Sequence, residues 1–382
     1  MSMSVINDFF AGFNDEVIVM ESFYSAIILS SFFGVLLSLK LKRRYLLLIW
    51  TIFGVISSFF PLIIVINSVE ALLFISFWFG FSFGFGMPSC LSYYADNTIF
   101  ENRGRAGGLI FFLANLSAVI FILFNFLVNN LIIALIYMAI WRGLSLCVFK
   151  LPMQKIETSK VKQVSFEMVL KSKPFLLYAI PWLMFSLVDS LEKVYLQSYI
   201  QISFGGNFLE FNQLVETIIG VFSAIFIGMV GDFIGRKRVI VYGFISLGLA
   251  YSLIGLAPFL DVFWYLYSVI DSVAWGIFSI MFILVIWGDL SPPESFREKY
   301  YVLGSVPFFF SKLIGGIFFP YTQALPAESA YAAFSLAAFF LFLAVVPLMY
   351  APETLPEKKI RERELKKYIE KAKKIKEKYV KE

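Results

Sequence analysis

The stretch Gly228-Met-Val-Gly-Asp-Phe-Ile-Gly-Arg-Lys-Arg238 joins two long apolar segments of this 382-residue chain. A related stretch, GVLLSLKLKRR, begins at Gly34, 194 residues before Gly228. The same offset aligns the basic runs 42–44 and 236–238 and carries Arg103 onto Arg297. A fixed internal offset is the signature of a repeated structural unit. The sequence therefore predicts two related halves.

The composition places these halves in a membrane. Apolar residues make up 59% of the chain and charged residues 15%, too few charges for a water-soluble surface. The chain has no histidine, which removes the side chain most used for metal binding and nucleophile activation. Cys90 and Cys147 lie far apart in apolar runs and are interpreted as packing residues. We therefore expect no enzyme activity, catalytic residue, cofactor or metal site.

Eleven apolar runs of transmembrane length predict an all-α polytopic membrane protein with two pseudo-repeated helical bundles. Five predicted spans form an N-terminal bundle within 1–150, at about 20–39, 45–66, 70–94, 107–128 and 130–150. Six form a C-terminal bundle within 174–350, at about 174–199, 211–231, 239–259, 262–288, 301–320 and 328–350. A central loop (151–173) and a charged tail (351–382) complete the predicted organisation.

Basic residues predict the orientation in the membrane. All but three of the 32 Lys and Arg residues fall in alternate connections or in the tail. Because Lys and Arg accumulate in cytoplasmic loops, the central loop and the tail are predicted to be cytoplasmic and the N-terminus external. The tail carries both charge signs beside a membrane span, which argues against nucleic acid as a partner. We expect a monomer in the cell membrane, with the lipid bilayer as its surroundings.

The offset also predicts an asymmetry between the halves. It places the counterpart of span 174–199 before Met1, so the first repeat is expected to lack its opening helix. Residues 1–19 are too short and too polar to replace that helix. They carry no basic start and no compact apolar core, so they do not resemble a signal peptide.

The string GMVGDFIGRK resembles the loop signature that follows the second helix of each half in the major facilitator superfamily. Within that superfamily the chain is most similar to sugar porters and related metabolite carriers. The resemblance implies that this loop latches the two halves together during alternating access. The implied gating residues are Gly228, Asp232, Gly235, Arg236 and Lys237.

Two further loops support the resemblance. DNTIFENRGR at 96–105 is similar to the superfamily's acid-then-RGR loop, and DLSPPESFR at 289–297 is its counterpart in the second half. Acids and arginines on one rim can form ion pairs that hold one conformation and break in another. The candidate gating residues from these loops are Asp96, Glu101, Arg103, Arg105, Asp289, Glu294 and Arg297. Pro352-Glu353-Thr354 resembles the closing PET motif of sugar porters.

The second half also carries ionisable residues inside apolar spans, where such residues usually face a partner or a water-filled cavity. Asp189, Glu192 and Lys193 are spaced to share one helix face, so Asp189 can pair with Lys193. The candidates for solute or ion contact are Asp189, Glu192, Lys193, Glu216, Asp271 and Lys312. An internal ion pair that only holds helices together is the alternative.

The sequence thus predicts a secondary active transporter that moves a small organic solute, a sugar or another metabolite, by alternating access. Coupling to a proton, through Asp189 or Asp271, is left open. The alternative is a non-transporting or truncated carrier-like membrane protein, either a sensor or a remnant. The absent opening helix favours that alternative, because the helix would line the cavity.

Overall fold

The computed structural model describes residues 16–63, 68–128, 130–150, 164–292, 296–323 and 329–355. Every regular element in this part of the chain is helical. Within these described ranges, eleven helices are long and apolar enough to cross a membrane, the number that the apolar runs predict. The all-α polytopic class is therefore confirmed. The first 15 residues, Glu294 and the tail beyond residue 355 lie outside the described residues, and so do the predictions that concern them.

Six helices make up the first half of the described chain. They are α2 (Glu16–Ser38), α3 (Arg43–Ile63), α4 (Val69–Gly84), α5 (Met87–Asp96), α6 (Arg103–Val128) and α7 (Leu131–Leu144). The predicted single span 70–94 is divided into α4 and α5. Pro88 stands in the first turn of α5, where its missing N–H costs no hydrogen bond.

The second half begins with the short α8 (Phe166–Leu170) and contains the longer helices. They are α9 (Lys173–Phe204), α10 (Gly206–Ile234), α11 (Arg236–Leu256), α12 (Asp261–Phe278), α13 (Ile286–Leu290), α14 (Glu298–Gln323), α15 (Ala330–Leu343) and α16 (Val345–Tyr350). A π-helical segment, Ser279–Val285, joins α12 to α13 inside the predicted span 262–288. Helices α9 and α10 run past their predicted ends, because backbone hydrogen bonding continues where the apolar run stops.

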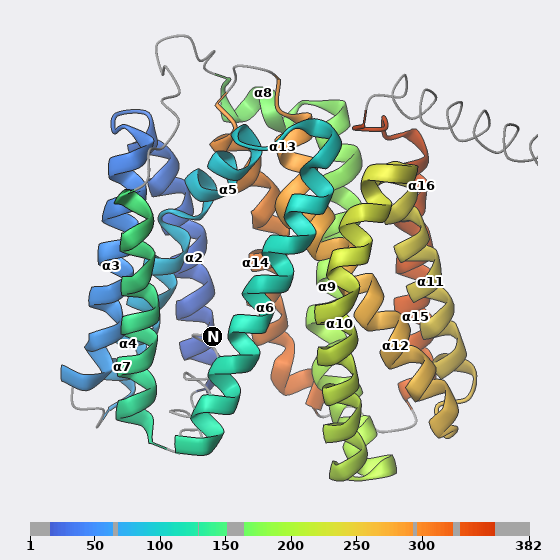
Figure 1. The fold of residues 1–382 in the computed structure, drawn as a ribbon. Helices are drawn as coiled ribbons and strands as arrows, with labels where there is room; N and C mark the ends of the chain where they lie inside the picture. The colour runs from blue at the N-terminus through green and yellow to red at the C-terminus, as the bar shows by residue number, and fades with distance from the viewer. Residues whose placement is uncertain are drawn as a thin grey trace, which may run out of the picture.

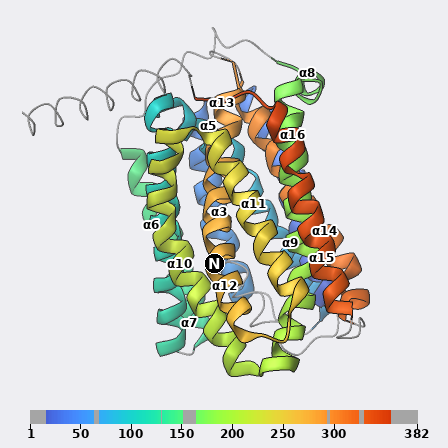
Figure 2. The same ribbon diagram turned by 90° about the vertical axis from the view of Figure 1, so that its right-hand side faces the viewer.

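The helices lie side by side in two groups (Figures 1 and 2). In the first half α2 packs on α4 and α3 on α7, and in the second half α9 packs on α14 and α11 on α12 and α15. The most extensive contacts between the halves are those of α6 with α10 and of α2 with α14, and α5 also meets α14. We call the end that carries α8 and α13 in Figure 1 the basic end, because Arg43, Arg103, Arg236 and Arg297 lie there.

The largest core lies in the second half and is aromatic. The Trp182 ring stacks on Phe282 and Phe308, with centroids 4.9 and 5.8 Å apart. Phe185 continues this stack and meets the edge of Trp275 at 5.1 Å. Trp275 in turn borders a cavity, so the packed core holds one wall of that cavity in place.

Candidate functional site: a membrane cavity and a sealed end

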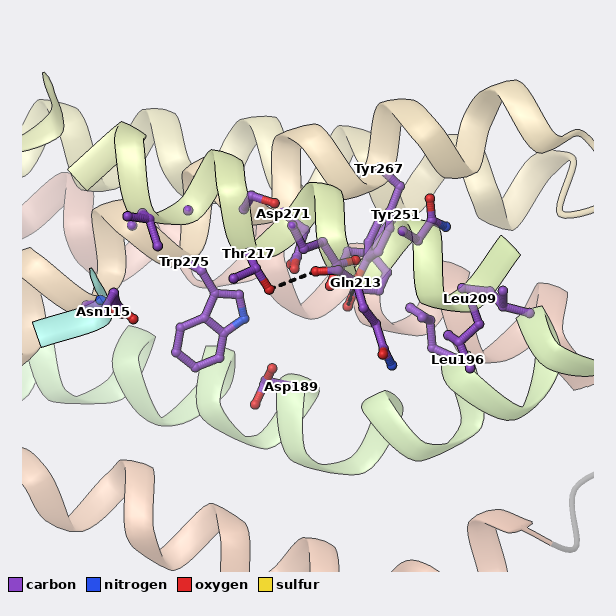
Figure 3. Close-up of a pocket in the computed structure, with 18 of the residues that line it drawn as sticks. Asn115, Asp189, Leu196, Leu209, Gln213, Thr217, Tyr251, Tyr267, Asp271 and Trp275 are labelled. Atoms are coloured by element: carbon purple, nitrogen blue, oxygen red, sulfur yellow. Dashed lines mark hydrogen bonds between the residues drawn. The ribbon is translucent and has the colours of Figure 1, made fainter. Parts of the chain in front are cut away.

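A cavity of about 430 Å³ lies between α9, α10, α11 and α12 of the second half and α6 of the first half (Figure 3). Asp189 lies near the middle of α9, whereas Leu209 lies about one turn from the start of α10. The cavity therefore extends from mid-membrane toward the end opposite the basic end. Its lining residues are Phe111, Asn115, Asp189, Leu196, Ile200, Leu209, Asn212, Gln213, Glu216, Thr217, Gly220, Val221, Tyr251, Tyr267, Asp271, Ser272, Trp275, Gly276 and Ser279.

Three of the predicted intramembrane acids meet in this cavity. Asp189, Glu216 and Asp271 come from α9, α10 and α12, and all three line the wall. Glu192 and Lys193 lie on the next turn of α9, but their side chains are outside the described part of the structure. The cavity thus brings together carboxylates that are far apart in the sequence.

Asp189 has a partner that the sequence analysis did not pair with it. Its carboxylate pairs with the Lys312 ammonium of α14 at 2.5 Å, whereas the sequence suggested Lys193 on the same helix. Close packing of α9 on α14 brings the two charges together. The Ser190 and Ser311 hydroxyls are 3.1 Å apart, and a Cβ at Gly315 would lie 2.9 Å from the Ser190 carbonyl oxygen. The i, i+4 spacing identified a face of α9 but not the helix that packs on it.

Polar groups that the sequence analysis did not select complete the wall. The Asn212 side chain is buried, and neither of its amide atoms has a hydrogen-bond partner among the described residues. The Tyr251 and Tyr267 hydroxyls are 3.0 Å apart, and the Thr217 hydroxyl donates to the Gln213 carbonyl (Figure 3). Polar residues inside the apolar spans were the signal that could have found them. In the described part of the chain, no three His, Cys, Asp or Glu side chains are grouped so that they could hold a metal ion.

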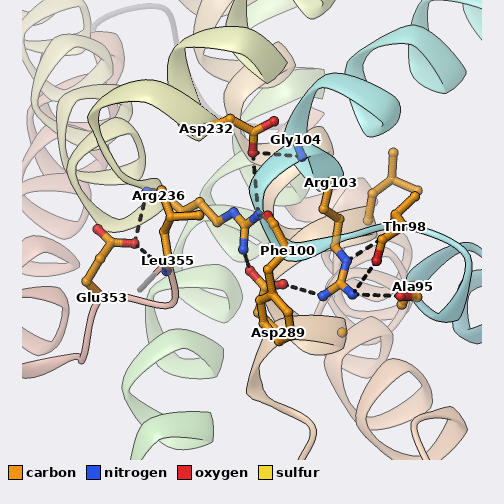
Figure 4. A network of polar contacts seen from close by, with 12 residues as sticks. Ala95, Thr98, Phe100, Arg103, Gly104, Asp232, Arg236, Asp289, Glu353 and Leu355 are labelled. Atoms are coloured by element: carbon orange, nitrogen blue, oxygen red, sulfur yellow. Dashed lines mark hydrogen bonds and ion pairs between the residues drawn. The ribbon is translucent and has the colours of Figure 1, made fainter. Parts of the chain in front are cut away.

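At the basic end, a buried carboxylate lies between arginines from both halves (Figure 4). Asp289 in α13 pairs with Arg103 from the start of α6 and with Arg236 from the start of α11. All three side chains are almost completely buried. Arg103 also donates to the Ala95 carbonyl at 2.6 Å, and Arg236 donates to the Phe100 carbonyl. This cluster seals the two halves against each other.

A second group of charges crosses the same interface. Arg43 of α3 pairs with Asp96 and with Glu298 of α14, both at 2.6 Å. Arg297 pairs with Asp96 at 3.1 Å. Burial lowers the pKa of the Arg297 guanidinium, and the Asp96 carboxylate opposes that effect. Arg43 and Glu298 were not among the predicted gating residues, although Arg43 belongs to the first basic run.

The loop of the opening motif contacts the first half through its backbone. Asp232 accepts hydrogen bonds from the Gly104 and Arg105 amides, and it lies 3.4 Å from the Arg236 guanidinium. Gly235 has φ of 104°, a conformation that favours glycine, and it precedes the first residue of α11. Gly228 packs against the backbone of α6.

The remaining gating candidates lie at the same end. The Arg105 guanidinium lies 5.1 Å from the Phe233 ring centroid, and the Lys237 ammonium donates to the Met349 and Ala351 carbonyls. Glu101 is half-buried in a short 3-10 turn before α6. The Glu353 carboxylate of the PET motif accepts from the backbone amides of the first turn of α11 (Figure 4).

Comparisons with known proteins agree with this architecture. The model of the Major Facilitator Superfamily matches residues 9–287, which is more than half of the chain. No curated protein matches the sequence. The proton:xylose symporter XylE bound to 6-bromo-6-deoxy-D-glucose has a similar structure, with a TM-score of 0.67 and 14% identity over 89% of this chain and 86% of that one.

Two other solved structures are similar. The E. coli fucose:proton symporter FucP gives a TM-score of 0.70 at 13% identity, over 92% of this chain and 95% of that one. A bacterial homologue of the iron transporter ferroportin, in an outward-facing state, gives 0.69 at 13% identity, over 91% and 92%. Similarity at this identity establishes the fold alone. The family match and the eleven apolar helices together show that the chain is a multi-pass membrane carrier, not an enzyme, and that it belongs to the major facilitator superfamily.

Proposed function

We propose that this secondary transporter moves a small organic solute, a sugar or another metabolite, by alternating access. The observation that carries the proposal is the combination of a sealed basic end with a polar cavity toward the opposite end. Alternating access requires a binding site that faces one side while the other side is closed. In this proposal Asp189, Glu216, Asp271 and Lys312 contact the solute or a coupling ion.

The seal has the properties that a reversible gate needs. Its ion pairs link the first half to the second through Arg103 with Asp289 and Arg43 with Glu298. A complete buried ion pair contributes little net stability, but loss of one partner leaves an uncompensated charge. The charges therefore favour states in which every pair is formed or every group is hydrated. Two discrete states follow, as a rocking carrier requires.

The positions of the basic residues give the proposed orientation. Because Lys and Arg accumulate on the cytoplasmic side, the basic end faces the cytoplasm in this proposal. The described conformation is then closed to the cytoplasm, and its cavity lies toward the outside. A membrane-impermeant thiol reagent applied to sealed cells should label a cysteine at exposed Leu256 but not one at exposed Tyr350. The reverse pattern would refute the orientation.

Proton coupling is proposed through Asp189 or Asp271. A proton on Asp189 would remove the charge that holds Lys312, and a proton on Asp271 would change the charge that the solute meets. Uptake into vesicles by Asp271→Asn and Asp189→Asn variants should lose its dependence on a proton gradient. Retention of full dependence in one variant would remove that residue from the coupling role.

Solute counterflow tests the transport function itself. Small sugars, polyols, amines and organic acids would first be screened for compounds that raise the melting temperature of the purified protein. Each stabilising compound would then be trapped inside proteoliposomes, and entry of its radiolabelled form would be measured. We expect transient accumulation that empty liposomes do not show. Stabilisation without counterflow would instead support the sensor on a carrier scaffold.

A further inference from the structure

We propose that the solute is an organic cation, with an ammonium or amidinium group attached to a part that carries hydroxyl or amide groups. This inference rests on the proposed function, because it takes the cavity between α6 and α9–α12 as the transport site. It narrows the solute from any small organic molecule to one charge class. Three features of the cavity support the inference: the charge of its lining carboxylates, the unpartnered amide of Asn212 and the ring of Trp275.

The charge of the wall favours a cation. Asp189, Glu216 and Asp271 line the cavity, and the described lining residues include no lysine or arginine. Lys312 of α14 pairs with Asp189 and is not among the described lining residues. A cationic solute is attracted by these carboxylates, whereas a neutral solute gains no such attraction. An anion would be repelled, since charges interact strongly where water is scarce.

The buried amide of Asn212 points to a bound group. Both amide atoms lack a hydrogen-bond partner among the described residues, although the residue is only 1% exposed. Such an orphaned group is costly to bury and is usually satisfied by water or a ligand. Asn212 lies four residues before Glu216 on α10, so the two share a face. A hydroxyl or amide of the solute can donate to the Asn212 carbonyl oxygen and accept from its NH2 group.

The aromatic wall suits the cationic end of the solute. The Trp275 ring, four residues after Asp271 on α12, is drawn in the cavity between the Asp271 and Asp189 carboxylates (Figure 3). Indole faces attract ammonium groups, most strongly where water is excluded. The carboxylates come from different helices around the wall, an arrangement suited to an extended molecule. A neutral polyol could donate hydroxyl groups to the three acids, but it would bring no positive charge to them or to the Trp275 face.

Matched isosteres test the charge class directly. Binding of choline, uncharged 3,3-dimethylbutan-1-ol and anionic 3,3-dimethylbutanoate would be measured by calorimetry on the purified full chain. A second series would consist of a benzyl-substituted cation, its neutral isostere and the matching anion. We expect the cation of at least one series to bind roughly tenfold or more tighter than its neutral isostere, since desolvated charge pairs dominate such contacts. The anions should not bind.

Variants assign the effect to the cavity. Asp271→Asn and Glu216→Gln should each weaken cation binding about tenfold and leave binding of the neutral isostere unchanged. Glu210→Gln is the matched control, because Glu210 is exposed on α10 and does not line the cavity. Melting curves without ligand show whether each variant is folded. The Asp271→Asn and Glu216→Gln variants each measure the loss of cation binding independently.

The outcomes separate this inference from the proposed function. If a neutral isostere binds as tightly as its cation, or if no cation of either series binds, the cation inference is wrong, while counterflow of neutral solutes would still support transport. If cations bind through Asp271 and Glu216 but show no counterflow, the inference stands and the transport function fails.

Discussion

The Asp232 carboxylate accepts a hydrogen bond of 2.9 Å from the backbone amide of Gly104, so the last turns of α10 cap the first turn of α6 in the other half. The Arg105 amide donates to the same carboxylate at 2.8 Å. The free amides at a helix N-terminus carry partial positive charge, which a carboxylate stabilises. The two halves are thereby joined through backbone groups, and Gly104 permits the approach because a Cβ there would lie 2.6 Å from both the Asp232 Oδ1 atom and the Gly228 carbonyl oxygen.

Replacement of Asp232 by asparagine should weaken the sealed conformation. The amide keeps one acceptor oxygen, but its NH2 group would face a backbone donor, and the charge at the helix end is lost. We expect a cost of about 1–3 kcal/mol to the sealed state. Spin labels on cysteines at exposed Tyr45 and Tyr350, in a background with Cys90 and Cys147 replaced by serine, would report the width of the basic end.

The distance distribution should shift to longer values in Asp232→Asn. Arg238→Gln removes a charge from an exposed position in the first turn of the neighbouring α11 and should leave the distribution unchanged. An unchanged distribution in Asp232→Asn would show that the cap does not hold the two halves together.

Asp289 should show the largest stability effect at the basic end. Asp289→Asn leaves Arg103 and Arg236 buried without the carboxylate that both contact. Loss of one member of a buried ion pair costs about 3–5 kcal/mol. The melting temperature of the purified protein should fall sharply, and the double variant Arg103→Gln with Asp289→Asn should fall by less than the two single effects combined. Additive effects would mean that the two side chains do not act as a unit.

The sequence revealed the spans more reliably than the contacts between them. Apolar runs and basic loops predicted eleven spans, because a helix must satisfy its backbone in lipid and its length is set by the bilayer. Periodicity describes one helix at a time, so Lys193 seemed the natural partner of Asp189. The structure adds Lys312, 123 residues away, as a partner because α14 packs on α9, whereas the Lys193 side chain lies outside the described residues. Asn212 escaped notice because its role depends on burial, which composition does not show.

The Asp189 and Lys312 pair can be assigned to structure or to transport by a neutral double replacement. Lys312→Met alone leaves a carboxylate in the span without the ammonium 2.5 Å away, and it should lower the melting temperature. The double variant Asp189→Asn with Lys312→Met removes both charges and should restore most of the stability. We expect counterflow to stay abolished, because Asp189 lines the cavity. Recovery of counterflow together with stability would make the pair purely structural.

Asn212→Leu should separate stability from binding. Leucine branches at the same carbon as asparagine and carries no polar atoms, so the empty cavity no longer holds an orphaned amide. We expect the ligand-free protein to gain about 1–3 kcal/mol of stability, measured by thermal unfolding. Binding of any compound that stabilises the natural protein should weaken. A loss of stability in the leucine variant would show that the amide has partners in the folded protein.

Gly228, in the motif that relates the two halves, should tolerate no side chain while the basic end is sealed. A Cβ at this position would lie 3.0 Å from the Gly104 carbonyl carbon and 3.1 Å from the Gly108 Cα, and these backbone atoms of α6 cannot rotate away. Gly228→Ala should therefore force α10 and α6 apart, at a cost of about 1–3 kcal/mol to the sealed state.

Gly143→Ala in α7 is the control, because the nearest atom to its new Cβ is 4.0 Å away. The control should be neutral or stabilising by roughly 0.5–1 kcal/mol, as alanine favours helix. The spin-label pair at Tyr45 and Tyr350 should move apart in Gly228→Ala alone. Equal distances in both variants would mean that close contact of α10 with α6 does not hold the basic end closed.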